Sequence, residues 1–203
     1  ICNTADDFVL HGLNISPDLD TILYTLAGLS NPEQGWGIRG DTFAVLQQLE
    51  KLGGDAWFKL GDKDIATHIT RTCWLRAGLE LSEVTDRLRR YLRIKAKLLP
   101  MSNDGIETRV DTAEGEISFQ EYFVKRRWQP EVKEVFYAGA EKSCPAPGVI
   151  QAIGEAAGII VSPSNPVTSI GPILAVPGIR NALQQVTTPV IGVSPMIGKL
   201  AIS

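Results

Sequence analysis

Two short apolar segments in the last quarter of the chain, Gly158–Ser162 and Pro189–Val193, each run directly into a small polar loop. Short runs of this kind, rich in β-branched residues, are typical of strands buried on both faces of a parallel sheet. Helical patterns occur between the expected strands. The sequence therefore predicts an α/β fold, an open, mostly parallel Rossmann-like sheet flanked by helices.

The middle of the chain departs from simple strand–helix alternation. Apolar residues recur at helical spacing, or at strand spacing between turn residues. Helices are predicted at Asp20–Leu29, Gly40–Leu52, Ile65–Ala77, Ser82–Leu92 (with Ser82 as cap) and Ala146–Ala157. Further strands are predicted at Ile1–Thr4, Lys97–Met101, Glu107–Thr112, Glu116–Tyr122 and Val132–Ala138, with a hairpin turn at 113–115. We expect one domain over residues 1–203, with an inserted helical and β-hairpin region at 30–130.

The overall charge excludes some classes of function. A net charge of -3 and a pI near 5.5 argue against a nucleic-acid-binding surface, which needs clustered Lys and Arg. The basic run Arg87–Lys97 is interpreted mainly as a solvated helix face. The three cysteines form no metal or redox motif, which fits a reducing cytoplasm. No apolar run approaches the roughly 18 residues of a membrane span, and no signal peptide is visible.

Acidic residues form clusters near the start of the chain. Asp6 and Asp7 precede the Pro17–Thr21 segment, which contains Asp18 and Asp20, and a Gly-Asp-Lys-Asp turn follows at 61–64. Carboxylates are the hard oxygen ligands that Mg²⁺ prefers, often together with substrate phosphates. Aspartates of this kind also cap helices and form turns. The clustering nevertheless favours a site for phosphoryl or nucleotidyl transfer.

The loop at 162–172 follows a predicted buried strand and is dense in hydroxyl groups, with one amide and a glycine. Such a loop can offer donors to a phosphate or a nucleobase edge, although its prolines also fit a purely structural turn. Ligands of open α/β sheets bind beyond the carboxyl ends of the strands. We therefore expect the Asp6-Asp7, Ser164-Asn165 and Ser194-Pro195 loops to share one rim.

Three further residues could meet a ligand. Lys63 lies at the start of a predicted helix, where its charge could reach a phosphate, or could simply be solvated. His68 lies one turn inside that helix, and a lone histidine there is more often a hydrogen-bonded core or rim residue than a base. Trp36 stands between two glycines, and an aromatic in such a loop could stack on a flat heterocycle.

A series of motifs, taken in order, covers nearly the whole chain. They are Asn3–Asp7, Pro17–Thr21, Gly35–Gly37, Leu60–Asp64 with Ala66–His68, Leu99–Asp104, Ser162–Pro166 with Ser169–Pro172, and Ser194–Gly198. Together they closely resemble the 2-phospho-L-lactate transferase family. The resemblance implies a Mg²⁺-dependent enzyme of deazaflavin coenzyme F-420 biosynthesis, and a homodimer.

The implied reaction transfers a phosphorylated three-carbon acid from a guanosine diphosphate conjugate to a ribityl hydroxyl of the deazaflavin Fo, and releases GMP. Phospholactate, phosphoenolpyruvate and phosphoglycerate all stay open as the transferred acid. The alternative is a non-catalytic regulator on the same fold that binds a nucleotide or a nucleotide sugar. A third possibility is a structural remnant that has lost donor binding.

The resemblance also implies roles for individual residues. It assigns catalysis to Asp20 and Asp18, and metal binding to Asp7, Asp18 and Asp20. It assigns Fo contacts to Asp20, Lys63, Trp36, His68 and Met101. It assigns the nucleotide to Ser164, Asn165, Ser169 and Gly171. Lys63 stands where the family often has Arg, which keeps the charge but changes the geometry of the contact.

The chain departs from the family pattern at both ends. The family begins with a strand and a Gly-Gly-Thr-Gly type loop, whereas this sequence opens at Ile1. The family also continues beyond the point where this sequence stops, at Ser203. We expect an incomplete catalytic unit whose ends are missing from the sequence, rather than a genuine truncation.

Overall fold

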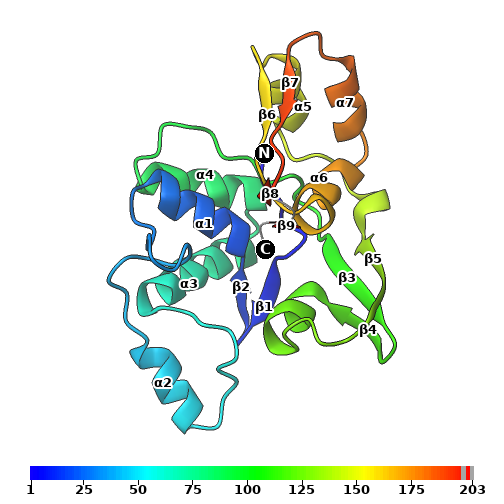
Figure 1. Cartoon of the computed structure of the whole chain (residues 1–203). Coiled ribbons are helices and arrows are strands. Elements are labelled where there is room, and N and C mark those ends of the chain that lie inside the picture. The colour runs from blue at the N-terminus through cyan, green and yellow to red at the C-terminus, as the bar shows by residue number, and fades with distance from the viewer. Residues whose placement is uncertain (198–199, 202–203) are drawn as a thin grey trace.

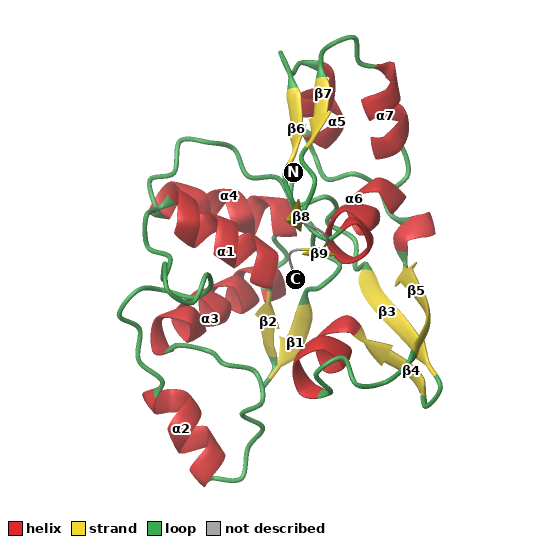
Figure 2. Ribbon diagram, viewed as in Figure 1, coloured by secondary structure: helices red, strands yellow, loops and turns green. Residues whose placement is uncertain are grey.

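The computed structural model describes residues 1–197 and 200–201. Figures 1 and 2 show a group of helices on one side, a three-stranded sheet on the other, and a smaller strand–helix group at the top of the view. The α/β class predicted from the sequence is confirmed. Gly198 of the Ser194–Gly198 motif lies outside the described residues.

The helical group consists of α1 (Pro17–Leu26), α2 (Ala44–Lys51), α3 (Asp62–Arg76) and α4 (Leu81–Tyr91). α1 begins with Pro17, whose fixed φ suits the first helical position. α4 begins after Glu80, whose backbone N–H donates to the Glu83 carboxylate at 2.9 Å, so Ser82 is not the cap. α1 and α4 share a core, made of Cys2, Leu19, Leu23, Tyr24, Val84, Leu88, Ile94 and Leu98.

Antiparallel pairing accounts for most of the strands. β1 (Phe8–Leu10) pairs with β2 (Leu13–Ile15) through a tight turn in which His11 and Gly12 have φ of 52° and 73°. This hairpin was not expected from the sequence. β3 (Glu107–Thr112) lies between β4 (Gly115–Ser118) and β5 (Val132–Ala138). β8 (Met196–Ile197) pairs with β9 (Leu200–Ala201).

The predicted parallel pairing is confirmed only in part. β6 (Ile159–Val161) and β7 (Val190–Gly192) are parallel. The predicted strands at Ile1–Thr4 and Lys97–Met101 meet in a single parallel bridge, Cys2 with Pro100. The predicted strand Glu116–Tyr122 is half wrong, because the chain leaves β4 after Ser118 and forms a π-helical turn, η1 (Glu121–Lys125).

A second core joins the C-terminal helices to the start of the chain. This part of the chain begins with a 3-10 turn, η2 (Ala140–Lys142), which precedes α5 (Val149–Gly154). After β6, a π-helical turn, η3 (Pro166–Ile170), leads directly into α6 (Gly171–Ala175), and α7 (Ile179–Gln185) follows. The core contains Ala5, Met101, Ile106, Ala140, Ala146, Val149, Ile153, Val176 and Ile179. α5 starts later than the predicted helix, because Pro145 and Pro147 precede it and Gly148, with a φ of 87°, is the residue before its first turn. None of the helices in the described part of the chain is long and apolar enough to span a membrane.

Candidate functional site

A cavity of about 470 Å³ opens between α1, α3 and η1. Most of its wall is aromatic or apolar, which suits a flat organic ligand. The aromatic residues are Tyr24, Trp36, Trp57, Phe58 and Phe123. Three ionisable side chains from the two helices, Asp20, Asp64 and His68, also line it.

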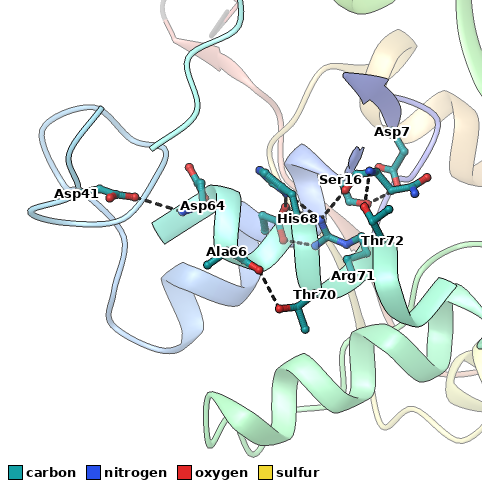
Figure 3. A network of polar contacts seen from close by, with 11 residues as sticks. Asp7, Ser16, Asp41, Asp64, Ala66, His68, Thr70, Arg71 and Thr72 are labelled. Atoms are coloured by element: carbon teal, nitrogen blue, oxygen red, sulfur yellow. Dashed lines mark hydrogen bonds and ion pairs between the residues drawn. The ribbon is translucent and has the colours of Figure 1, made fainter. Parts of the chain in front are cut away.

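Helical spacing brings these polar groups onto facing surfaces. Asp20 and Tyr24 are four residues apart on α1, and Asp64, His68 and Arg71 follow one another at intervals of four and three on α3. Residues at these intervals lie on one face of a helix. Figure 3 shows the α3 side chains between Asp41, at one end of the network, and Ser16 and Asp7 at the other.

A buried ion pair joins the two helices. Arg71 donates to Asp20 through both terminal nitrogens, at 3.0 Å from Nη1 to Oδ2 and with Nη2 against Oδ1. Arg71 is 1% exposed and Asp20 is 4% exposed. Both Asp20 oxygens are therefore engaged by a cation from within the protein. Asp20 lines the cavity, but it is not a free carboxylate.

His68 completes this network as a neutral group. Burial is the main reason that its pKa falls to about 4, and the opposing effect of the Asp20 charge and the lowering effect of the Arg71 charge are smaller. Its Nδ1 lies 3.2 Å from Arg71 Nη1, so Nδ1 can accept a hydrogen bond. A neutral imidazole that accepts at Nδ1 carries its proton on Nε2. Near neutral pH His68 is thus a polar wall residue without charge.

Three carboxylates form an acidic cluster beside the start of α1: Asp6, Asp7 and Asp18. Asn3 Nδ2 donates to Asp6 at 3.1 Å and to Asp18 at 2.8 Å. Ser16 donates to Asp7 at 2.6 Å. The Oδ1 atoms of Asp6 and Asp7 are buried without a hydrogen-bond partner among the described residues.

The electrostatics of the acidic cluster suit the binding of a cation. Burial raises the pKa of Asp6 to about 7, and the Asp18 charge adds to this effect. Burial likewise raises the pKa of Asp7 and of Asp18 above their usual range. A nearby positive charge would favour the ionised forms of these carboxylates.

The predicted metal site is not assembled as expected. Within residues 1–197 and 200–201, no three His, Cys, Asp or Glu side chains converge to hold a metal ion by themselves. In the predicted set Asp7, Asp18 and Asp20, both oxygens of Asp20 contact Arg71, whereas Asp7 accepts from Ser16 through Oδ2 and leaves Oδ1 without a partner among the described residues. Mg²⁺ needs only one or two protein carboxylates when water and phosphate complete its shell. The free oxygens of the acidic cluster fit that smaller role.

The predicted nucleotide loop lies next to this cluster. Asn165 Oδ1 accepts from the backbone N–H groups of Val167 and Thr168, at 2.9 and 3.2 Å, and so fixes the start of η3. Asn3 Nδ2 reaches the Thr168 carbonyl at 3.4 Å. Gly171 packs so closely on the Tyr137 hydroxyl that a Cβ there would collide with it. Segments far apart in sequence thus meet beside Asp6 and Asp18.

Comparison with known proteins decides the family. The profile of the family described as 2-phospho-L-lactate transferase CofD matches residues 1–201. This chain belongs to the CofD family. A Streptomyces griseus protein named phosphoenolpyruvate transferase is 52% identical over 203 residues, a match that covers 98% of this chain and 64% of that protein. A protein of the same name from Mycolicibacterium smegmatis is 46% identical over 204 residues, covering 97% and 62% of the two chains.

The CofD-family chain thus spans somewhat less than two thirds of the length of these relatives. A crystal structure of protein BH3568 from Bacillus halodurans, described as a member of the UPF0052 family, superposes with a TM-score of 0.61 at 20% identity. That superposition covers 95% of this chain and 59% of the other. It supports the fold alone.

The structure brings together some of the predicted Fo contacts and separates others. Asp20, Trp36 and His68 line the cavity. Lys63 does not line it, because its Nζ donates to the Gly40 carbonyl at 3.1 Å on the exposed side of α3. Met101 is fully buried in the second core, where packing leaves it no surface for a ligand.

Several residues of the cavity and its network were not expected from the sequence. Tyr24 lies in the helical face that begins at Asp20, and Arg71 lies in the face that begins at Asp64 and His68. The spacing of these residues was therefore a usable signal. Trp57 and Phe58 come from an irregular segment before α3. No periodic pattern marks them.

Proposed function

We propose that the full-length protein transfers a phosphoenolpyruvyl group from a guanosine diphosphate conjugate to the deazaflavin Fo and releases GMP. The family assignment supports a transferase, and the names of the relatives favour phosphoenolpyruvate among the three acids that the sequence leaves open. The observation that carries the proposal is an aromatic cavity placed beside an acidic cluster.

The cavity would bind the deazaflavin ring. Trp36, from the loop before α2, and Trp57 and Phe58, from the segment before α3, offer flat apolar surface, and aromatic rings stack well on such surfaces. The Asp20–Arg71 pair fixes α1 against α3 and so holds the cavity open at a defined width. Asp20 acts in this proposal as a positioning residue.

The acidic cluster would meet the reacting groups. Its unpartnered oxygens on Asp6 and Asp7, together with water and the donor phosphates, would hold Mg²⁺, which when bound neutralises the donor diphosphate and the GMP leaving group. Asp18 accepts a hydrogen bond from Asn3 and has a raised pKa, so it can also take the proton of the attacking hydroxyl. The hydroxyl oxygen then bonds to phosphorus as the bond from phosphorus to GMP breaks.

The loop at 164–171 would bind the donor. Ser164, Asn165, Ser169 and Gly171 lie in or beside η3, which contacts the acidic cluster through Asn3. The proposal also includes a homodimer, and the mass of the protein in solution would test it.

A single-turnover assay tests the proposal. Full-length protein would be mixed with Fo, Mg²⁺ and each of the phosphoenolpyruvyl, phospholactyl and phosphoglyceryl conjugates of guanosine diphosphate, and the products followed by mass. We expect transfer and GMP release with the first conjugate. Tight nucleotide binding without transfer from any conjugate would instead identify a regulatory protein.

A variant connects this assay to the cavity. Trp36→Ala removes an aromatic wall of the cavity, so we expect Fo affinity to fall by roughly tenfold, the scale of about 1–3 kcal/mol that stacking on an aromatic side chain contributes. Tyr91→Ala serves as the matched control, because Tyr91 is 83% exposed on α4 and does not line the cavity. Equal Fo affinity for the two variants would remove the cavity from the proposal.

A further inference from the structure

One end of the cavity carries a hydroxyl and a carboxylate side by side. Tyr24, from α1, and Asp64, from α3, both line the cavity, and the two side chains are close enough to influence each other's ionisation. Asp64 lies between Asp41 and His68, on the side of the polar network away from Asp7 (Figure 3). Along α1, Asp18 and Tyr24 are about 9 Å apart at a rise of 1.5 Å per residue. This end therefore lies away from the acidic cluster.

Neither group is fully used by the protein. The Tyr24 hydroxyl is buried, with the residue 2% exposed, and makes no hydrogen bond of good geometry within the described chain. Asp64 is 7% exposed, and no Lys, Arg or His of residues 1–197 and 200–201 forms an ion pair with it. A buried polar group without a partner costs stability, so such groups call for an explanation.

An adjacent donor and acceptor match one kind of ligand edge. Tyr24 O–H can donate to a carbonyl oxygen, and the Asp64 carboxylate can accept from a ring N–H. A cyclic amide or imide presents a carbonyl and an N–H next to each other in one plane. The aromatic walls of the cavity favour a flat ring as the body of that ligand.

We propose that Tyr24 and Asp64 recognise the imide edge of a pyrimidinedione ring and thereby set the direction in which the ligand enters. This inference rests on the proposed function, in which Fo supplies such a ring. With the imide edge at Asp64, the opposite end of the ligand faces the acidic cluster. Tyr24 and Asp64 are then specificity residues for the acceptor and take no part in bond making.

Binding of three ring compounds to the full-length protein tests the assignment. The compounds are Fo, Fo methylated on its imide nitrogen, and an alloxazine without a side chain, each titrated by quenching of tryptophan fluorescence. We expect methylation to weaken binding at least about tenfold, because it removes the N–H that donates to a charged acceptor. Asp64→Ala should weaken Fo binding by a similar factor and abolish the discrimination between the two forms.

Tyr24→Phe provides a second and independent readout. We expect it to weaken Fo binding by about three- to tenfold, the scale of one neutral hydrogen bond. The stability of the free protein should change by less than about 1 kcal/mol, because the hydroxyl makes no hydrogen bond of good geometry among the described residues. Tyr91→Phe and Glu50→Gln are matched controls, since both residues are exposed and outside the cavity.

The outcomes separate this inference from the proposed function. If Fo and its methylated form bind equally well to a protein that transfers normally, the edge assignment is wrong and the function stands. If the alloxazine binds in a manner that depends on Tyr24 and Asp64 but Fo is never a substrate, the function is wrong and the edge assignment stands. Failure to bind any of the three compounds overturns both.

Discussion

The Asp20–Arg71 pair makes Asp20→Asn a far larger perturbation than its chemistry suggests. From the sequence alone the change looks mild, since it removes one charge with almost no change in volume. In the structure it leaves the Arg71 guanidinium, 1% exposed, without its counter-charge. Breaking one side of a buried ion pair costs about 3–5 kcal/mol.

That cost is a large part of the stability of a typical domain, which is about 5–15 kcal/mol. With a urea slope of about 2 kcal/mol per molar, a loss of about 4 kcal/mol lowers the unfolding midpoint by about 2 M. Urea unfolding of the full-length protein, followed by tryptophan fluorescence, would measure it. Asp86→Asn is the control, because Asp86 pairs with Arg89 and Arg90 at the surface and such pairs contribute about 1 kcal/mol or less.

The double variant Asp20→Asn with Arg71→Met separates the charge from the packing. The double variant removes both charges together, so we expect it to recover more than half of the stability lost in Asp20→Asn. A double-mutant cycle over the two sites gives the interaction energy between Asp20 and Arg71. An Asp20→Asn protein within about 1 kcal/mol of the parent would refute the reasoning. The same result would return Asp20 to the role of a free catalytic carboxylate.

Three further predictions follow from the site. Without divalent ions, the free energy of unfolding should fall as pH rises from about 4 to 7, because the pKa of Asp6 is about 7 in the folded protein and 3.8 in the unfolded chain. The Asp6→Asn variant should flatten this pH profile. It should also reduce the rise in Tm that Mg²⁺ produces. His68→Gln should lessen the loss of stability as pH falls from 6.5 to about 4, because the folded His68 resists protonation while the unfolded one accepts it; an unchanged acid limb would contradict this. Gly171→Ala should lower unfolding free energy by about 1–3 kcal/mol through its collision with Tyr137, and Tyr137→Phe should relieve part of that loss in thermal melts.

Local patterns predicted the elements that local forces form. β3 and β5 have the predicted bounds, and β4 begins one residue before the predicted strand. These strands could be predicted because turn residues and the alternation of apolar and polar residues act over neighbouring positions. α3 was predicted for the same reason, although it begins three residues earlier, at Asp62. The β1–β2 hairpin was missed because its turn at His11 and Gly12 is not a common turn pair.

The sequence by itself determined the α/β class, the family, and the residues from which a site could be built. Only the tertiary structure decided which of these residues meet. It paired Asp20 with Arg71, which lies 51 positions later, buried Met101, and turned Lys63 away from the cavity. The physical reason is that burial and ion pairing depend on which faces of distant helices pack together, whereas spacing along the chain fixes only which residues share a face.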